Sequence, residues 1–308
     1  MTGSPRVLIV GGAGQVGREL QRSFASFGDI VAVDRESLDI AIPEEIRALI
    51  RRVRPQVILN AAAYTAVDRA ESEPELAMAI NGDAPRVLAE EARSSDALLV
   101  HYSTDYVFDG SKAAPWIEDD APYPLSVYGA SKLAGEEAIR KVGGRYLIFR
   151  TSWVYGPHGN NFLLTMLRLG RERDVLRVVD DQHGAPTSSI EIANATRVIA
   201  EGALAGRFGE SEARAGLYHM TCSGVTTWCG FAQAIFAHTE HRLDRRVPEV
   251  KAIASSEFPT AAKRPANSVL SNAKLRASFG VALAPWETAL EAVVERLAAT
   301  KQADLPRG

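Results

Sequence analysis

Residues 7–17 read Val-Leu-Ile-Val-Gly-Gly-Ala-Gly-Gln-Val-Gly, and this stretch decides the fold. Four apolar residues predict a strand buried on both faces, and the apolar spacing after Gly17 predicts a helix. Gly12 and Gly14 let the backbone turn and approach a pyrophosphate, while Gly17 lets the helix pack close to the strand. The first turn of the helix would present free N–H groups to the anion. The order strand, glycine loop, helix therefore predicts a dinucleotide site.

A second predicted strand, Ile30 to Val33, ends in Asp34, twenty residues after Gly14. A carboxylate at this place binds the 2′-hydroxyl of the adenine ribose, which favours NADH. Arg35 follows, and its guanidinium could hold a 2′-phosphate instead, so NADPH stays open. The alternative is that the glycine loop is only a tight turn and that Asp34 is only an acidic residue on the surface, with no role in binding a cofactor.

Strands and helices continue to alternate along the first half of the chain. This order predicts an α/β fold with a doubly wound parallel sheet, whose ligands lie beyond the carboxyl ends of the strands. The loop at Ala62–Thr65 and the segment Ser103–Asp105 fall at that edge. The further predicted strands are Gln56–Asn60, Leu98–Tyr102 and Tyr146–Phe149, and the predicted helices are Pro43–Val53, Glu71–Arg93 with a soft break near Asn81-Gly82, and the segment carrying Tyr128 up to Lys141.

After Pro157 the alternation stops, which predicts a smaller C-terminal substrate domain. We expect residues 1–154 to form the dinucleotide-binding domain, with 185–221 returning to it, and 155–184 with 222–308 to form the substrate domain. A charged loop at 210–214 and a frayed tail after Thr300 are also expected. The elements predicted in this half are helices starting at Asn160–Phe162 and running to Arg171, then Ile190–Gly202, Thr227–Ala237 and Trp286–Leu297, and strands Leu176–Val179 and Leu217–Met220.

Tyr128 and Lys132 are four residues apart on one predicted helix, so they share a face. An ammonium about 4 Å from a phenol is worth roughly 4 kcal/mol at an effective dielectric near 20. Lys132 is therefore expected to lower the pKa of Tyr128 by about one to three units and to make it an acid. The alternative is an ordinary pair on a surface helix.

Composition excludes several classes of protein. The chain has 308 residues and a net charge of −3, which gives no electrostatic signature for nucleic acid or an acidic membrane. No apolar run reaches the ~18 residues that a membrane span needs. Cys222 and Cys229 fit no metal pattern and indicate a reducing compartment, so we expect a cytoplasmic protein. The histidines show no metal spacing and are interpreted as structural, namely His101, His158, His183 and His219.

Several longer motifs carry a family resemblance. With the glycine loop, Thr104, Tyr128 and Lys132 at one edge, the chain resembles the extended short-chain dehydrogenase/reductase family, whose dinucleotide domain is a Rossmann fold. Within it, the chain looks like the reductases that complete dTDP-L-rhamnose synthesis, from Val7 to about Trp286. The motifs are Gly14–Gly17, Asn60–Ala63, Ala70–Glu73, Tyr102–Phe108, Arg150–Tyr155 and Asp181–Thr187.

The resemblance implies that NADH or NADPH gives hydride to C4 of dTDP-4-dehydro-β-L-rhamnose. Tyr128 would protonate the forming alkoxide, Lys132 would hold the nicotinamide ribose, and Thr104 would hydrogen-bond the sugar oxygen. Asp105 and Trp153 would touch the sugar. The residues implied for the cofactor are Gly11, Gly14, Gln15, Val16 and Gly17 at the pyrophosphate, Asp34 at the ribose, Asp39 and Ile40 at the adenine, and Ala63, Tyr64, Thr65 and Tyr102 towards the nicotinamide.

Other roles stay open at this stage. Arg264 could clamp the substrate pyrophosphate or lie in a surface loop, and Asn161 could reach the nucleotide or cap a helix. Thr104 and Asp105 could be a cap and a turn residue, and Trp153 could be plain core. Tyr64 departs from several relatives. Glu19 matches a position that bridges magnesium in some dimeric relatives, but its partners could not be placed, so no metal is predicted.

Two rival functions share these motifs. One is a reductase of another dTDP-4-keto-6-deoxyhexose, and the other is a non-catalytic NAD(P)-binding regulatory protein of the same fold. We expect a dTDP-sugar as the partner, no nucleic acid or membrane, and a monomer or homodimer.

Overall fold

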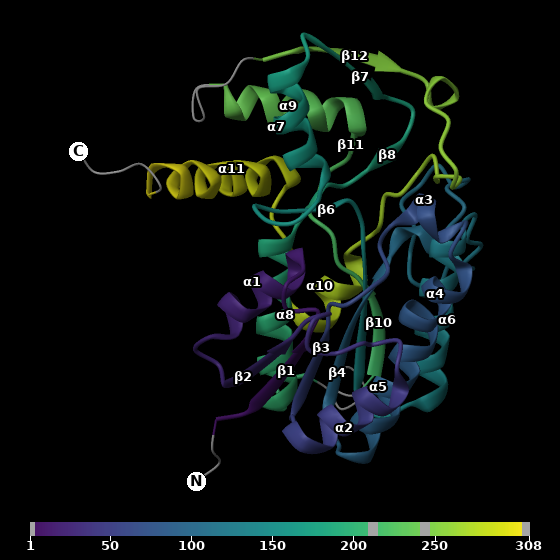
Figure 1. The fold of residues 1–308 in the computed structure, drawn as a ribbon, viewed down its shortest axis with the longest axis vertical. Helices are drawn as coiled ribbons and strands as arrows, with labels where there is room; N and C mark the ends of the chain where they lie inside the picture. Colours follow the sequence, from purple (N-terminus) through teal and green to yellow (C-terminus); the bar gives the residue numbers. More distant parts are fainter. Residues whose placement is uncertain (1–3, 209–214, 241–246, 304–308) are drawn as a thin grey trace.

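The computed structural model describes residues 4–208, 215–240 and 247–303, and within them a six-stranded parallel sheet forms the centre of the lower layer (Figure 1). The strand order is β10-β5-β4-β3-β1-β2, so the direction of winding reverses between β1 and β3. The α/β doubly wound fold predicted from sequence is confirmed. The strands are β1 (Arg6–Val10), β2 (Asp29–Val33), β3 (Val57–Asn60), β4 (Leu98–Thr104), β5 (Tyr146–Thr151) and β10 (Ala215–His219).

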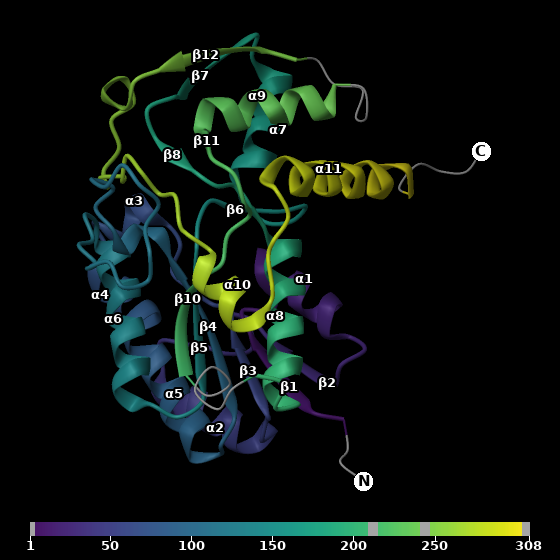
Figure 2. The same cartoon turned by 180° about the vertical axis from the view of Figure 1, so that it is seen from behind.

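Both faces of the sheet are buried, as the apolar run of β1 requires. Val7 and Ile9 enter one hydrophobic cluster, and Leu8 and Val10 enter the other, because successive side chains of a strand point to opposite faces. Helices cover both faces (Figure 1, Figure 2). One face carries α1 (Gln15–Phe24), α8 (Ser189–Leu204) and α10 (Ala273–Phe279), and the other carries α2 (Pro43–Val53), α5 (Ala84–Ser94) and α6 (Val127–Val142).

The helix predicted at Glu71–Arg93 is interrupted where a soft break was expected. It consists of α4 (Pro74–Met78), a π-helical turn (Ala79–Asp83) and α5. A Cβ on Gly135 of α6 would lie 2.1 Å from the Asn81 carbonyl oxygen, so α6 presses directly on this turn. The short helix α3 (Val67–Ala70) precedes it and was not predicted.

A second lobe stands above the carboxyl ends of the strands (Figure 1, Figure 2). Its strands β7 (Val175–Val179) and β12 (Glu249–Ile253) pair in parallel. Its helices are α7 (Phe162–Glu172), α9 (Trp228–Thr239) and α11 (Trp286–Ala303). The short strand β6 (Val154–Tyr155) pairs with β9 (Thr187–Ser188), and β8 (His183–Gly184) pairs with β11 (Thr226–Thr227).

The two lobes share one hydrophobic core. Tyr155 and Phe231 of the upper part belong to the same cluster as Val7 and Phe149 of the sheet. The returning segment supplies α8 and β10 to the lower layer. The division into two domains stays a prediction. Neither β12 nor α10 was predicted, and the charged loop at 210–214 lies outside the described residues, as does most of the tail.

Candidate active site

The glycine loop makes a close-packed turn between β1 and α1. Gly11 has a φ of +86°, and a Cβ there would lie 2.6 Å from the backbone nitrogen of Ala62. A Cβ on Gly17 would lie 2.1 Å from the Gly11 carbonyl oxygen, whereas one on Gly14 would meet only that oxygen, at 3.2 Å. The loop therefore packs tightly against the end of β3 and against α1, and is open beside Gly14.

The first turn of α1 fits an anion. Its N-cap is Gly14, which makes no side-chain hydrogen bond to the helix, and the first turn carries no acidic residue. The helix N-terminus thus offers unpaired N–H groups and a partial positive charge. Gln15 is held in place, because its side chain donates to the Asn160 carbonyl oxygen at 3.3 Å and accepts from Asn161 Nδ2 at 2.9 Å. A dinucleotide pyrophosphate fits this cradle.

The residues predicted for the adenosine side follow β2. One carboxylate oxygen of Asp34 accepts from the backbone of Glu36 and from the Ser37 hydroxyl, so Asp34 also fixes the turn that carries it. Asp39 is exposed and Ile40 packs against the hydrophobic cluster of the α2 face. Arg35 is exposed next to Asp34, so this stretch carries both a carboxylate and a guanidinium.

The loop after β3 is tied to α6 by Asn81, a residue to which the sequence alone assigned no role. Asn81 is buried in the π-helical turn, where its amide accepts from Tyr64 N at 2.9 Å and donates to Tyr64 O at 3.0 Å. It also donates to the Ser131 hydroxyl at 3.0 Å. The Tyr64 hydroxyl is bound by the Glu73 carboxylate. Ala63 and Tyr64 are half-buried and Thr65 is exposed at this edge.

Helix α6 sets the positions of Tyr128 and Lys132. It starts at a capping serine, since Ser126 Oγ accepts from Gly129 N at 3.2 Å. A Cβ on Gly129 would lie 2.2 Å from the Tyr106 carbonyl oxygen, so the helix begins directly on the segment that follows β4. Tyr128 packs edge-on against Tyr106, with ring centroids 5.5 Å apart.

Lys132 is one of the most buried charged residues, with 2% of its surface exposed. Its Nζ donates to the Tyr102 carbonyl oxygen at 2.6 Å and lies 3.4 Å from His101 Nε2. Burial lowers the pKa of Lys132 to about 8, which the nearby Glu136 carboxylate opposes.

The prediction that Lys132 lowers the pKa of Tyr128 is wrong. Loss of water around the hydroxyl raises the pKa of Tyr128 to about 12, with a smaller increase from the Asp105 charge and an opposing hydrogen bond with Thr104. The Lys132 charge is not among the causes of this pKa shift, and its ammonium is bound to the backbone carbonyl oxygen of Tyr102.

Thr104 and Asp105 end β4 beside Tyr128. Thr104 Oγ1 accepts from Tyr106 N at 3.2 Å and donates to Asp105 Oδ1 at 3.0 Å, so it is both a cap and a neighbour of the phenol. Burial raises the pKa of Asp105 to about 6, and hydrogen bonds from Ser268 and Thr104 limit the rise. Among the described residues, the other oxygen of Asp105 has no hydrogen-bond partner, although it is buried.

Aromatic residues line the boundary between the lobes. Trp153 has a φ of +48° and stacks on Trp228 with centroids 3.7 Å apart and planes 11° from parallel. Both rings are half-buried. Tyr102 contributes its backbone to the site, but its side chain points into the core, where the hydroxyl lies 2.9 Å from Thr196 Oγ1. A contact of the Tyr102 ring with cofactor is therefore not favoured by this geometry.

The two residues with open roles have different surroundings. Asn161 caps α7, since its Oδ1 accepts from Leu164 N at 3.0 Å while its Nδ2 donates to neighbouring carbonyl groups. Arg264 donates from Nη2 to Asp68 Oδ2 at 2.8 Å, and its buried Nε has no partner within the part of the chain that the structure describes. Asn161 is thus occupied by the fold, whereas Arg264 has one donor without an acceptor among these residues.

Glu19 is paired with cations. Its carboxylate lies 3.0 Å from Arg22 and 2.7 Å from Arg296, with 3% of the side chain exposed. Within the described residues, no group of three or more His, Cys, Asp or Glu side chains could hold a metal ion. Cys222 and Cys229 are buried free thiols.

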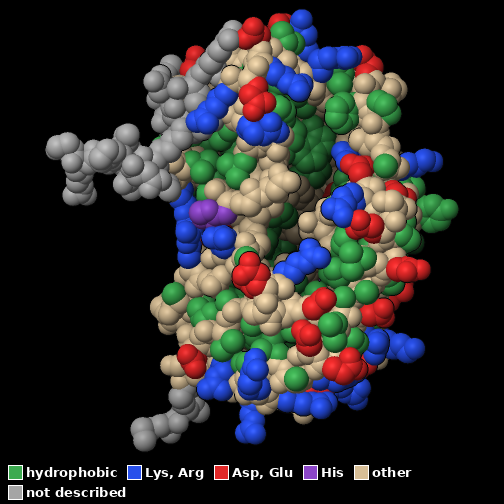
Figure 3. Space-filling model, in the orientation of Figure 1, with side chains coloured by type: hydrophobic (Ala, Val, Ile, Leu, Met, Phe, Trp, Pro, Cys, Tyr) green, Lys and Arg blue, Asp and Glu red, His purple; other side chains and the backbone are tan. Residues whose placement is uncertain are grey.

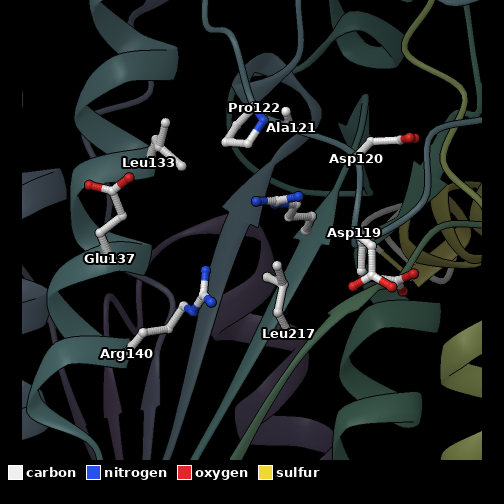
Figure 4. A pocket seen from close by; sticks show the side chains of 10 residues that line it. Asp119, Asp120, Ala121, Pro122, Leu133, Glu137, Arg140 and Leu217 are labelled. Carbon is white, nitrogen blue, oxygen red and sulfur yellow. The ribbon is translucent and has the colours of Figure 1, made fainter.

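The surface is hollowed between the two lobes (Figure 3), above the strand ends that carry these residues. A separate pocket of about 280 Å³ lies on the outer side of the sheet, between α6, β10 and the loop at residues 118–122 (Figure 4). It is lined by carboxylates, including Asp119, Asp120 and Glu137, and by Arg140 and Arg150. None of the predicted site residues lines it.

The sheet order, the glycine loop and the Tyr128/Lys132 pair define a member of the extended short-chain dehydrogenase/reductase class. The chain belongs to the RmlD substrate binding domain family, whose family model matches residues 5–299. The dTDP-4-dehydrorhamnose reductase of Burkholderia thailandensis is 46% identical over 298 residues, covering 95% of this chain and 99% of that protein. The enzyme of the same name from Escherichia coli K12 is 42% identical, covering 96% and 98%.

A solved structure gives the same relationship. The crystal structure of dTDP-4-dehydrorhamnose reductase from Bacillus anthracis in complex with NADP has a TM-score of 0.85 and 36% identity, and the match covers 94% of this chain and 98% of that one. Among the described residues, none of the helices combines the length and apolar character needed to cross a membrane.

Proposed function

We propose that this protein is an NAD(P)H-dependent reductase that converts the C4 ketone of dTDP-4-dehydro-β-L-rhamnose to dTDP-β-L-rhamnose. The observation that carries the proposal is the meeting of Tyr128, Thr104 and Lys132 at the carboxyl end of β4, on the same edge of the sheet as the loop of Gly14. The names of the relatives support the same substrate, and the NADP bound to the Bacillus anthracis enzyme supports the cofactor.

The bound nicotinamide, NADH or NADPH, supplies the hydride. Tyr128 keeps its proton at neutral pH, because its pKa is raised to about 12, and gives it to the carbonyl oxygen as that oxygen becomes an alkoxide. We propose that Thr104, which lies beside the phenol, helps to fix the direction of the Tyr128 hydroxyl. A proton donor aimed at the oxygen where negative charge develops lowers the barrier.

Lys132 supplies a cation beneath the reacting groups, and its short bond to the Tyr102 carbonyl oxygen holds the ammonium in place. We propose that it also donates to the nicotinamide ribose. The N-terminus of α1 and Gln15 bind the pyrophosphate, and Asp34 binds the adenine ribose. Arg35 beside Asp34 leaves room for a 2′-phosphate, so we propose that either cofactor is accepted.

For the substrate, we propose that Asp105 accepts from a sugar hydroxyl through its unpartnered oxygen, and that Trp153 contacts the ring. Arg264 lies where a loop of the upper part meets Asp68, with a buried free donor. A guanidinium pairs well with phosphate oxygens, so we assign Arg264 to the dTDP diphosphate.

The test is an assay of purified protein with the 4-keto-L-sugar nucleotide and NADH or NADPH, followed at 340 nm. We expect consumption of the reduced cofactor and formation of the L-rhamno product. The stereochemistry of the product distinguishes this function from reduction of another dTDP-4-keto-6-deoxyhexose. Cofactor binding without any turnover would favour a non-catalytic binding protein instead.

A further inference from the structure

Behind the proposed proton donor lies a buried chain of polar groups that the proposed mechanism does not use. Asn60 of β3 and His101 of β4 are register partners, and Asn60 Nδ2 lies 3.0 Å from His101 Nδ1. On the other side of the ring, His101 Nε2 lies 3.4 Å from Lys132 Nζ. Asn60 and His101 each have 1% of their surface exposed, so water cannot substitute for these partners.

The His101 ring can hold only one proton. Burial, and then the Lys132 charge, lower the pKa of His101 well below its ordinary value, so the ring is neutral and carries one proton. A lysine ammonium has only donors, which means that it needs a bare Nε2 facing it. The ring proton must then lie on Nδ1 and must be accepted by the amide oxygen of Asn60.

The opposite arrangement also gives the ring nitrogens of His101 hydrogen-bond partners. If Asn60 presents Nδ2 to the ring, as in this structure, Nδ1 is the acceptor and the ring proton lies on Nε2, where Lys132 accepts it once the lysine has lost its charge. The amide oxygen of Asn60 then accepts from Ala62 N at 3.3 Å, a long and weak bond. Turning the amide gives up this weak bond and places Asn60 Nδ2 opposite the Ala62 N–H, while Asn60 Oδ1 gains the ring proton as a donor. We therefore infer that both arrangements are accessible.

We propose that His101 is a positioning residue for Lys132, and that its ring proton moves from Nδ1 to Nε2 when Lys132 loses its charge. Accepting a hydrogen bond from the ammonium through Nε2, His101 favours the charged lysine in the working enzyme. The catalytic importance of this linkage rests on the proposed function, but the linkage itself does not.

The charged groups around Lys132 are consistent with gain and loss of its proton close to neutral pH. Burial lowers the pKa of Lys132 to about 8, and Glu136 of α6 opposes the change. Glu136 is itself engaged by Arg150 of β5, with nitrogen–oxygen distances of 2.9 and 2.6 Å. From β4, the contacts to the ammonium come from the His101 ring and the Tyr102 carbonyl oxygen.

The direct test is nitrogen NMR of the full chain with ¹⁵N-labelled histidine between pH 6 and 10. We expect the two ring nitrogens of His101 to exchange character as Lys132 titrates, and this change to be absent in Lys132→Met. His219 is an internal control, because it is also buried and its Nδ1 lies 3.1 Å from the Trp116 carbonyl oxygen, which fixes its tautomer. A single tautomer of His101 across the range would overturn the proposal.

Kinetics give a second test through the alkaline limb of kcat/KM. His101→Met removes the acceptor, and the limb should move to lower pH by about one unit, whereas His101→Gln keeps an acceptor and should move it by less than about 0.3. The matched control His219→Gln should leave the limb in place. A folded His101→Met with the wild-type profile would contradict the role. Exchange of the His101 tautomer in a protein without reductase activity would overturn the proposed function but not the linkage.

Discussion

The Nζ atom of Lys132 lies 2.6 Å from the carbonyl oxygen of Tyr102, and this bond decides what the lysine can do. The spacing of Tyr128 and Lys132 suggested that the ammonium acts on the phenol. Instead, the backbone at the end of β4 holds the ammonium, and Thr104 is the side chain beside the phenol. We therefore expect the lysine to act as a fixed cation on the cofactor side of the site.

The glycine loop allows steric effects on folding to be separated from effects on cofactor binding. Gly17→Ala places a methyl group 2.1 Å from the Gly11 carbonyl oxygen and should lower the free energy of unfolding by about 1–3 kcal/mol. Gly14→Ala meets one atom, at 3.2 Å, and should keep the melting temperature. It should nevertheless weaken NADPH binding at least tenfold, measured by titration calorimetry. Unchanged affinity in Gly14→Ala would contradict the placement of the pyrophosphate.

Asp105 should make the protein less stable as the pH rises. Its pKa is raised from 3.8 to about 6, so the folded state holds the proton more tightly than the unfolded state. Stability from this group is present below pH 4 and is lost between about pH 4 and 6, which amounts to up to about 3 kcal/mol at pH 7. Asp105→Asn should raise the unfolding free energy at pH 7 and flatten this part of the profile.

The measurement for Asp105 is urea unfolding at several pH values between 4 and 8. The control is Asp109→Asn, since Asp109 lies close by in the chain and hydrogen bonds from Ser111 lower its pKa. If Asp105→Asn reproduces the wild-type slope against pH, the buried carboxylate does not have the proposed environment.

Arg264 should act on substrate binding and not on chemistry. Loss of a charge-assisted hydrogen bond costs about 1.5–3 kcal/mol, so Arg264→Met should raise the KM for the dTDP-sugar roughly 10- to 100-fold with little change in kcat. Asp68→Asn is the matched control, because it removes the charge of the carboxylate 2.8 Å from Arg264 and leaves the guanidinium in place. Steady-state kinetics check this, and a wild-type KM in Arg264→Met would exclude the diphosphate assignment.

Local sequence patterns were sufficient for the sheet and the glycine loop. The apolar run of β1 and the Gly14/Gly17 spacing are determined by chain geometry over a few residues, and the predicted α2 has the observed bounds Pro43–Val53. The pairing of β12 with β7 could not be predicted, because it joins segments about seventy residues apart and β12 is mostly exposed.

The site was harder to predict than the fold. Asn81 was missed because its function depends on a π-helical turn against which α6 packs through Gly135, a tertiary contact without a local signature. The Tyr128 pKa was predicted in the wrong direction because the spacing gives a charge but not the loss of water. His101 was interpreted as structural. Its pairing with Asn60 on β3 and its contact with Lys132 on α6 join segments that are distant in the sequence.

The central claim is that Tyr128 gives the proton to the reduced carbonyl. Its most direct test is single-turnover oxidation of NADPH by wild type and Tyr128→Phe with the 4-keto-sugar nucleotide, with cofactor affinity measured in parallel. We predict that Tyr128→Phe binds NADPH as wild type does but turns over about 10²- to 10⁴-fold more slowly. Turnover at the wild-type rate in Tyr128→Phe would contradict the account.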